Sequence, residues 1–115
     1  MCGINGIFAY HYAAGPVDRT ELLKSRDHMA SRGPDGSGAW FSDDSRIGLG
    51  HRRLAIIDLT EGGAQPMAGA SGTTVLTFNG EIYNYRDLRA RLEAKGQVFR
   101  SHSDTEVLLN LYEEK

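Results

Sequence analysis

Hydrophobic and polar residues along this chain switch between the spacing of strands and that of helices. Gly3 to Tyr10 is a short apolar run with several small residues, which predicts a buried strand. Further strands are predicted at Trp40–Phe41, Ile47–Ile57 and Thr73–Asn79, the last two separated by a loop rich in Gly, Ala and Pro. The pattern therefore indicates one α+β unit without a linker or a low-complexity segment.

Three helices are predicted where a capping residue precedes apolar residues at helical spacing. Asp18–Glu21 is a capping-box sequence that begins a helix running to about Ala30. Asn84 caps the second helix, and Gly96 ends it. Its apolar face consists of Tyr85, Leu88 and Leu92. A second capping box, Ser103–Glu106, begins the third helix, with an apolar face of Val107, Leu108, Leu111 and Tyr112.

Two further features of the sequence are a turn-rich loop and a helical pattern that is not closed at the end of the chain. Ser31–Gly38 reads SRGPDGSG, and its proline and three glycines favour a turn-rich loop over a helix or strand. Lys115 lies inside the third helical pattern, before any Gly, Asn or Pro that would close it. We therefore expect residues 1–115 to be a truncated domain.

Composition excludes several classes of function. Apolar residues make up 40% of the chain, charged residues 24%, and the formal net charge is −2, as in ordinary soluble domains. A basic surplus that would indicate nucleic acid is absent from the sequence, as are an apolar stretch of bilayer length and a signal-peptide pattern. Because the chain has a single cysteine, we expect a reducing, cytoplasmic environment.

That single cysteine, Cys2, directly follows the initiator methionine. A cysteine nucleophile needs a base, usually histidine, yet the four histidines show neither metal-binding spacing nor the local signatures of common cysteine proteases. Removal of Met1 would supply another base, because free α-amino groups titrate near ~8 and thiols near ~8.5. From Cys2 alone, an incidental position and an N-terminal nucleophile are equally open.

A second candidate element is the sequence NGEIYN at residues 79–84. It follows a predicted strand, so the amide of Asn79 and the backbone N–H of Gly80 lie where a strand opens into a loop. Two such donors can form an oxyanion hole for a tetrahedral intermediate. An Asn-Gly turn without chemistry is the common alternative.

Five motifs in a fixed order distinguish these alternatives. They are MCGI at 1–4, RGPDG at 32–36, GHRRL at 50–54, NGEIYN at 79–84 and SDTE at 103–106. Together they resemble the N-terminal glutaminase domain of glutamine-hydrolysing asparagine synthetases. These are class II glutamine amidotransferases, a branch of the N-terminal nucleophile hydrolases. The resemblance extends over all 115 residues.

The resemblance implies a role for each site residue. Cys2 would attack the side-chain amide of glutamine with its own amine as base, while Asn79 and Gly80 would hold the oxyanion. Arg53 would bind the substrate carboxylate, and Asp104, helped by Glu81, its ammonium group. The lid that closes over bound glutamine would contain Arg32 and Gly33. Two neighbours of Arg53 are expected to have ordinary roles: Arg52 as a solvated strand residue, and His51 in local packing or hydrogen bonding.

The resemblance also implies a fold and a set of partners. The family fold is a four-layer α/β/β/α sandwich, of which this chain would hold the N-terminal portion. No metal or cofactor is expected in this domain. ATP and Mg²⁺ would act in a C-terminal synthetase domain, where ammonia meets an activated aspartate or a related carboxylate. A homodimer is compatible with this scheme.

Other functions stay open from the residues. One is a class II amidotransferase with a different acceptor. A second is a non-catalytic module that binds glutamine as a sensor, although such a module would not need Cys2. A third is a redox or metal-binding protein that uses Cys2 and the histidines.

Overall fold

A computed structural model describes residues 2–55 and 61–114 of the chain. Its strands are β1 (Gly3–Phe8), β2 (Gly36–Phe41), β3 (Ile47–Arg53), β4 (Met67–Ala68) and β5 (Val75–Leu76). Its helices are α1 (Arg19–Asp27), α2 (Tyr85–Ala94) and α3 (Asp104–Glu114), with a short 3₁₀ helix at Glu61–Gly63. This composition confirms the predicted α+β class.

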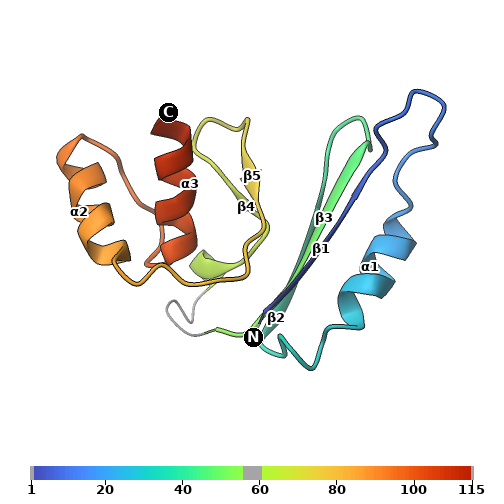
Figure 1. Ribbon diagram of the computed structural model, residues 1–115, viewed down its shortest axis with the longest axis horizontal. Helices are drawn as coiled ribbons and strands as arrows, with labels where there is room; N and C mark the ends of the chain where they lie inside the picture. Colours follow the sequence, from blue (N-terminus) through green and yellow to red (C-terminus); the bar gives the residue numbers. More distant parts are fainter. Residues whose placement is uncertain (1, 56–60, 115) are drawn as a thin grey trace.

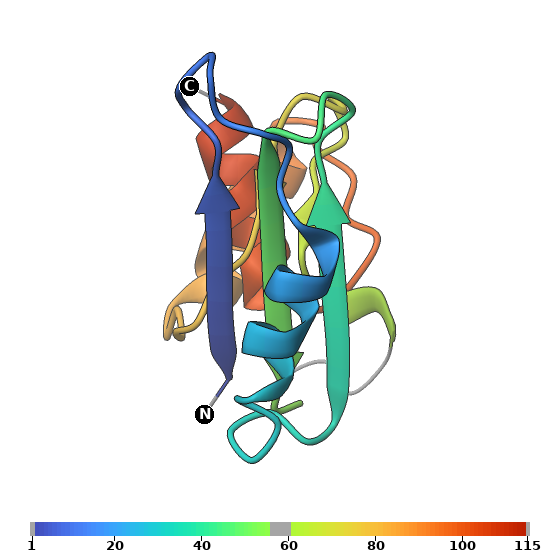
Figure 2. The ribbon, with the colours of Figure 1, turned by 90° about the vertical axis from the view of Figure 1, so that its right-hand side faces the viewer.

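The strands form two separate antiparallel sheets. The larger has the order β1-β3-β2, and its register places Gly3 opposite Arg52 and Trp40 opposite Leu49. The smaller pairs β4 with β5. As Figure 1 shows, α1 lies on one face of the larger sheet, and the small sheet lies on the other side, followed by α3 and α2. In Figure 2, α1 lies in front of the larger sheet and α3 lies behind it.

Helix α1 begins where its capping residue predicts. The Asp18 carboxylate accepts hydrogen bonds from the N–H groups of Thr20 and Glu21, at 2.9 and 3.2 Å. Leu22 is fully buried against the sheet, and α1 packs on both β1 and β3. The helix ends at Asp27, before the predicted Ala30, because tight turns that lead into the RGPDG segment follow it.

Strand β1 differs from the buried strand predicted from Gly3 to Tyr10. It ends at Phe8, and its apolar side chains are not buried, since Ile4 is 45% and Phe8 63% exposed.

The ends of the other predicted strands also differ from the prediction. Strand β2 starts at Gly36, inside the segment predicted to lack regular structure. Its Gly38 allows close approach, because a Cβ there would lie 1.9 Å from the Gln65 carbonyl oxygen. Strand β3 ends at Arg53, and the predicted end at Ile57 lies outside the described residues. The last predicted strand, Thr73–Asn79, is paired only at Val75–Leu76.

The last two helices have the predicted starts with different capping contacts. Asn84 precedes α2 without a side-chain capping bond, and Gly96 follows its end at a φ of +94°. At α3, the Ser103 hydroxyl accepts from the Thr105 N–H at 3.1 Å. Glu106 does not close the capping box. Its buried carboxylate instead accepts from the N–H groups of Arg100 and Ser101.

The apolar core is small. In the described chain, the buried hydrophobic residues are Val17, Leu22, Leu92, Val107 and Leu109. Leu109 was not on the apolar face predicted for the third helix, whereas Tyr112, which was, is 70% exposed. A cavity of about 540 Å³ lies between the larger sheet, the β4–β5 hairpin and α3. Its lining residues include Trp40, Leu49 and Leu108. Within the described ranges, no helix combines the length and apolar character needed to cross a membrane.

Candidate functional site

A cavity of about 430 Å³ brings together residues from both ends of the chain. It contains all six residues predicted for catalysis and substrate binding: Cys2, Arg53, Asn79, Gly80, Glu81 and Asp104. The other lining residues are His51, Leu54, Gly63, Gln65, Phe78, Tyr83, Ser103 and Thr105. The start of β1, the end of β3, the segment after β5 and the first turn of α3 therefore meet at one site.

Cys2 is held against the strand-end residue Leu54. The Leu54 N–H donates to Cys2 Sγ at 3.3 Å, and the thiol donates to the Leu54 carbonyl oxygen at 3.6 Å. Cys2 is half-buried and lines the cavity. Met1 lies outside the described residues, and the predicted role of the α-amine therefore stays a prediction.

The RGPDG segment runs alongside the residues that hold the thiol. The Asp35 N–H donates to the Arg53 carbonyl, and the Ala55 N–H donates to Asp35 Oδ2, both at 2.9 Å. Gly33 is buried here, and a side chain would not fit, because a Cβ would lie 2.3 Å from the Arg52 carbonyl carbon. Neither Arg32 nor Gly33 lines the cavity, and the lid role stays a prediction.

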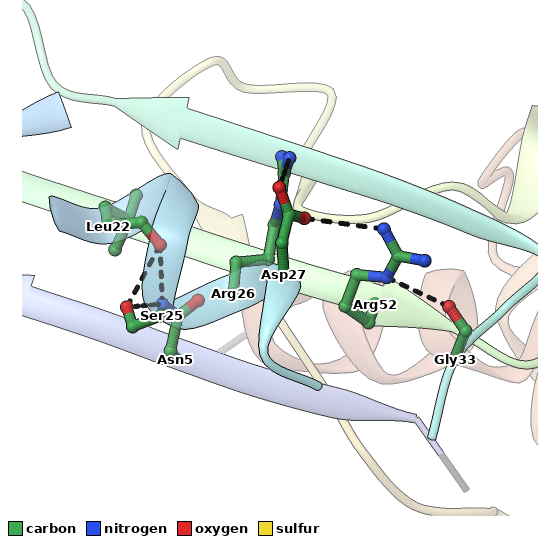
Figure 3. A network of polar contacts seen from close by, with 7 residues as sticks. All are labelled: Asn5, Leu22, Ser25, Arg26, Asp27, Gly33 and Arg52. Carbon is green, nitrogen blue, oxygen red and sulfur yellow. Dashed lines mark hydrogen bonds and ion pairs between the residues drawn. The ribbon is translucent and has the colours of Figure 1, made fainter. Parts of the chain in front are cut away.

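Arg52 is not the solvated residue that was predicted. Its Nε donates to the Gly33 carbonyl at 3.0 Å, and a terminal nitrogen pairs with Asp27 Oδ1 at 3.4 Å. Figure 3 shows Arg52 between these partners, so that it joins α1, the RGPDG segment and β3. The side chain is 17% exposed. Hydrogen bonding from Arg26, with a further contribution from Arg52, holds the pKa of the Asp27 carboxyl below its usual range.

The residue before the predicted oxyanion donors, Phe78, has both of its backbone polar groups in contact with side chains. The Phe78 N–H donates to Gln65 Oε1 at 2.6 Å, and the Phe78 carbonyl lies 3.2 Å from His51 Nε2. Asn79 and Gly80 come next and line the cavity. A Cβ on Gly80 would lie 2.8 Å from the Phe78 ring, so a larger residue would have to push this ring aside.

His51 has the local role that was predicted. It is 1% exposed and contacts Phe78, and this burial lowers the pKa of its imidazole. A neutral imidazole that donates from Nε2 to a carbonyl leaves Nδ1 as an acceptor. In the described part of the chain, Nδ1 has no hydrogen-bond partner.

Asp104 presents a buried carboxylate at the first residue of α3. It is 6% exposed, and its Oδ2 accepts from the Ile82 N–H at 3.0 Å. Glu81 is exposed and lies on the same cavity. The cavity thus combines a thiol, a guanidinium group, two carboxylates and two potential oxyanion donors.

Sequence reasoning missed several residues that build this site. Gln65 lay in a loop rich in Gly, Ala and Pro, where a single amide side chain carries no chemical signal. Leu54 acts through its backbone, which sequence does not reveal. Across the described residues, no group of three or more His, Cys, Asp or Glu side chains is arranged to hold a metal ion.

Comparisons with known proteins show which family this sequence matches. A family model described as a glutamine amidotransferase domain matches residues 1–115. Asparagine synthetase [glutamine-hydrolyzing] 1 of Bacillus subtilis (strain 168) is 49% identical over 97% of this chain and 17% of its own length. Asparagine synthetase B of Escherichia coli (strain K12) is 44% identical over 100% of the chain and 20% of its own length. Amidase chry2 of Gibberella zeae is 40% identical over 97% of the chain and 18% of its length.

The chain thus spans about a fifth or less of the length of these relatives. The family match, in contrast, covers the whole chain, including all the residues of the cavity. This chain belongs to the glutamine amidotransferase domain family, and it matches the glutaminase half of asparagine synthetases.

Proposed function

We propose that this site hydrolyses glutamine to glutamate and ammonia through a γ-glutamyl thioester on Cys2. The observation that carries the proposal is the meeting of Cys2, Arg53, Asn79, Gly80 and Asp104 in one cavity. Side chains separated by up to 102 positions in sequence are thereby placed around a volume large enough for a small amino acid.

The chemistry divides into two acyl transfers. Cys2 Sγ attacks the amide carbon of glutamine as the α-amine takes the thiol proton, and the carbonyl oxygen becomes an oxyanion. Asn79 and the Gly80 N–H stabilise that charge. Collapse of this tetrahedral intermediate breaks the C–N bond of the amide. The proton on the α-amine passes to the leaving nitrogen to give ammonia. Water then attacks the thioester, which releases glutamate and restores the thiol.

Charge complementarity supports glutamine as the substrate. Arg53 offers a planar cation that can bind the α-carboxylate with two parallel hydrogen bonds. Asp104 keeps one oxygen on the Ile82 N–H, and a carboxylate has further lone pairs for the α-ammonium group. Glu81 adds a second negative charge at the same cavity.

The complete protein is proposed to be an asparagine synthetase-type ligase. In it, ammonia would pass to an ATP-activated aspartate, or a related carboxylate, in a C-terminal domain that binds ATP and Mg²⁺. The amidotransferase domain itself would need no cofactor, work in the cytoplasm and tolerate homodimer formation. The order of helix, sheet, sheet and helix in Figure 1 supports a four-layer α/β/β/α sandwich for the whole domain.

A different acceptor is the second candidate, because the similarity to Amidase chry2 shows that related domains occur in proteins that carry another name. Ammonia release from glutamine would be the same in both cases. Product analysis with aspartate and with other carboxylates as acceptors distinguishes them.

Glutamine hydrolysis by the full-length protein that carries this chain tests the proposal. Wild-type protein should release glutamate, and Cys2→Ala should release none while still binding glutamine in calorimetry. Cys2→Ala should also retain ammonia-dependent synthesis, because the acceptor site does not use the thiol. A wild-type protein that binds glutamine without hydrolysing it would instead be a non-catalytic binding module.

A further inference from the structure

Both backbone polar groups of Phe78 are bound by side chains from other parts of the fold. The N–H donates to Gln65 Oε1 at 2.6 Å, and the carbonyl accepts from His51 Nε2 at 3.2 Å. Phe78 directly precedes Asn79. The two bonds therefore restrain the peptide groups on both sides of Phe78, and the second of these groups leads into the proposed oxyanion donors. Both supporting side chains are buried, with exposures of 9% for Gln65 and 1% for His51.

Gln65 also connects this segment to α3. Its Nε2 donates to Thr105 Oγ1 at 3.1 Å, and Thr105 follows Asp104 in the first turn of the helix. The Gln65 backbone is packed against β2, where Gly38 leaves room for the Gln65 carbonyl oxygen. One side chain therefore joins Phe78, which precedes the proposed oxyanion donors, to Thr105, which follows the proposed ammonium-binding residue.

His51 supplies a second, independent restraint on Phe78. It projects from β3, the strand that ends at Arg53, and its burial favours the neutral imidazole. The neutral ring donates one hydrogen bond, and the Phe78 carbonyl oxygen accepts it. The oxyanion segment is thus tied to β3 and to α3 at the same residue.

We propose that Gln65 is a positioning residue, which with His51 fixes the backbone on both sides of Phe78 and thereby the orientation of Asn79 and Gly80. This inference rests on the proposed glutaminase function. An oxyanion hole works only when its donors are aimed before the charge develops, and a misplacement of about 1 Å can cost roughly 100-fold in rate. Gln65 does not contact the reacting atoms in this scheme and acts through the backbone of Phe78.

Three variants of the full-length protein separate the contacts of Gln65. Gln65→Met keeps the length of the side chain and removes the oxygen that accepts from Phe78. Gln65→Glu keeps an acceptor oxygen, to which the Thr105 hydroxyl can also donate. Thr105→Val removes only the contact to α3 and leaves both bonds to Phe78. Each variant is measured for glutamine kcat and KM, for alkylation of Cys2 by iodoacetamide, and for amide exchange at Phe78.

We expect Gln65→Met to lower kcat by about 10- to 100-fold with KM within about threefold, and to accelerate exchange of the Phe78 N–H. Iodoacetamide alkylation should be unchanged, because it does not use the oxyanion donors. Gln65→Glu should restore kcat to within about fivefold of wild type, and Thr105→Val should stay in the same range.

An unchanged kcat in Gln65→Met would overturn the inference, as would an equal loss in Thr105→Val. If Gln65→Met does not fold, Gln65→Glu decides, and a loss beyond tenfold in kcat with normal KM overturns it. Absence of hydrolysis by wild-type protein would instead contradict the proposed function, so the two failures are distinguishable.

Discussion

At the scale of single residues, Cys2 combines a thiol with a position directly after Met1. If its α-amine is the base, the base exists only after Met1 is removed. Protein that retains Met1, or that carries an N-terminal tag, should bind glutamine but lose about 100-fold or more in turnover, the usual contribution of general acid–base catalysis. Intact mass and glutaminase assays before and after tag cleavage measure this. Equal activity in both forms would exclude the amine as the base.

Arg53 and Asp104 should contribute to binding more than to the chemical step. Replacing either by alanine leaves one charge of bound glutamine unpaired, which costs about 2 kcal/mol or more, so KM should rise roughly 30-fold. Arg91→Ala and Asp87→Ala are matched controls, because both residues are exposed on α2 and do not line the cavity. A glutamine KM unchanged in Arg53→Ala or Asp104→Ala would remove that residue from the binding site.

His51 should make stability depend on pH. Burial lowers the pKa of its imidazole below the ordinary 6.5, so the unfolded chain takes up the proton more readily than the folded one. Its contribution to stability is complete above pH 6.5 and declines as the pH falls through the lowered pKa. Urea unfolding between pH 7.5 and 5 should show a smaller decline for His51→Gln than for wild type. Identical slopes would contradict this assignment.

At the scale of elements, the RGPDG segment stabilises the end of β3 through the hydrogen bonds of Asp35. Asp35→Ala removes the acceptor for the Ala55 N–H and should cost about 1 kcal/mol or less of stability, because the carboxylate is exposed. Amide exchange at Leu54 and Ala55 should accelerate. Asp35→Asn keeps an acceptor oxygen and should remain close to wild type. Unchanged amide exchange in Asp35→Ala would show that the Asp35 carboxylate does not stabilise the end of β3.

Element prediction succeeded where a local signal exists and failed where packing decides. Asp18 and Ser103 cap their helices because each side chain reaches N–H groups only two or three residues ahead. The start of β2 at Gly36 could not be predicted in this way. Glycine and proline favour turns locally, yet pairing with β3 and the close approach to Gln65 make this stretch a strand.

At the scale of the whole molecule, the described residues expose apolar surface and strand edges. Both outer strands of the larger sheet are edges in the described structure, and on β1 Phe8 is 63% exposed and Ile4 45%. A cavity of about 540 Å³ separates the larger sheet from the β4–β5 hairpin and α3. Unpaired edges and exposed apolar side chains favour association. We expect the isolated 115-residue chain to be marginally stable and oligomeric, with little or no glutaminase activity.

Sedimentation, thermal melts and a glutaminase assay on the isolated chain check this expectation. Phe8→Lys on the edge strand should reduce association, because a charge there opposes strand pairing. A cooperative, active monomer at high concentration would show that the open edges are harmless and that these residues form a complete catalytic unit.

The sequence by itself determined the α+β class, the helix starts, the family and the six residues now found around one cavity. These depend on local chemistry and on the order of motifs, which a linear chain displays. Only the tertiary structure decided that Gln65 and His51 hold the Phe78 peptide, that Leu54 holds the Cys2 thiol, and that Arg52 joins α1 to the RGPDG segment. These contacts join residues between 13 and 52 positions apart, and strand register and burial determine which of them can meet.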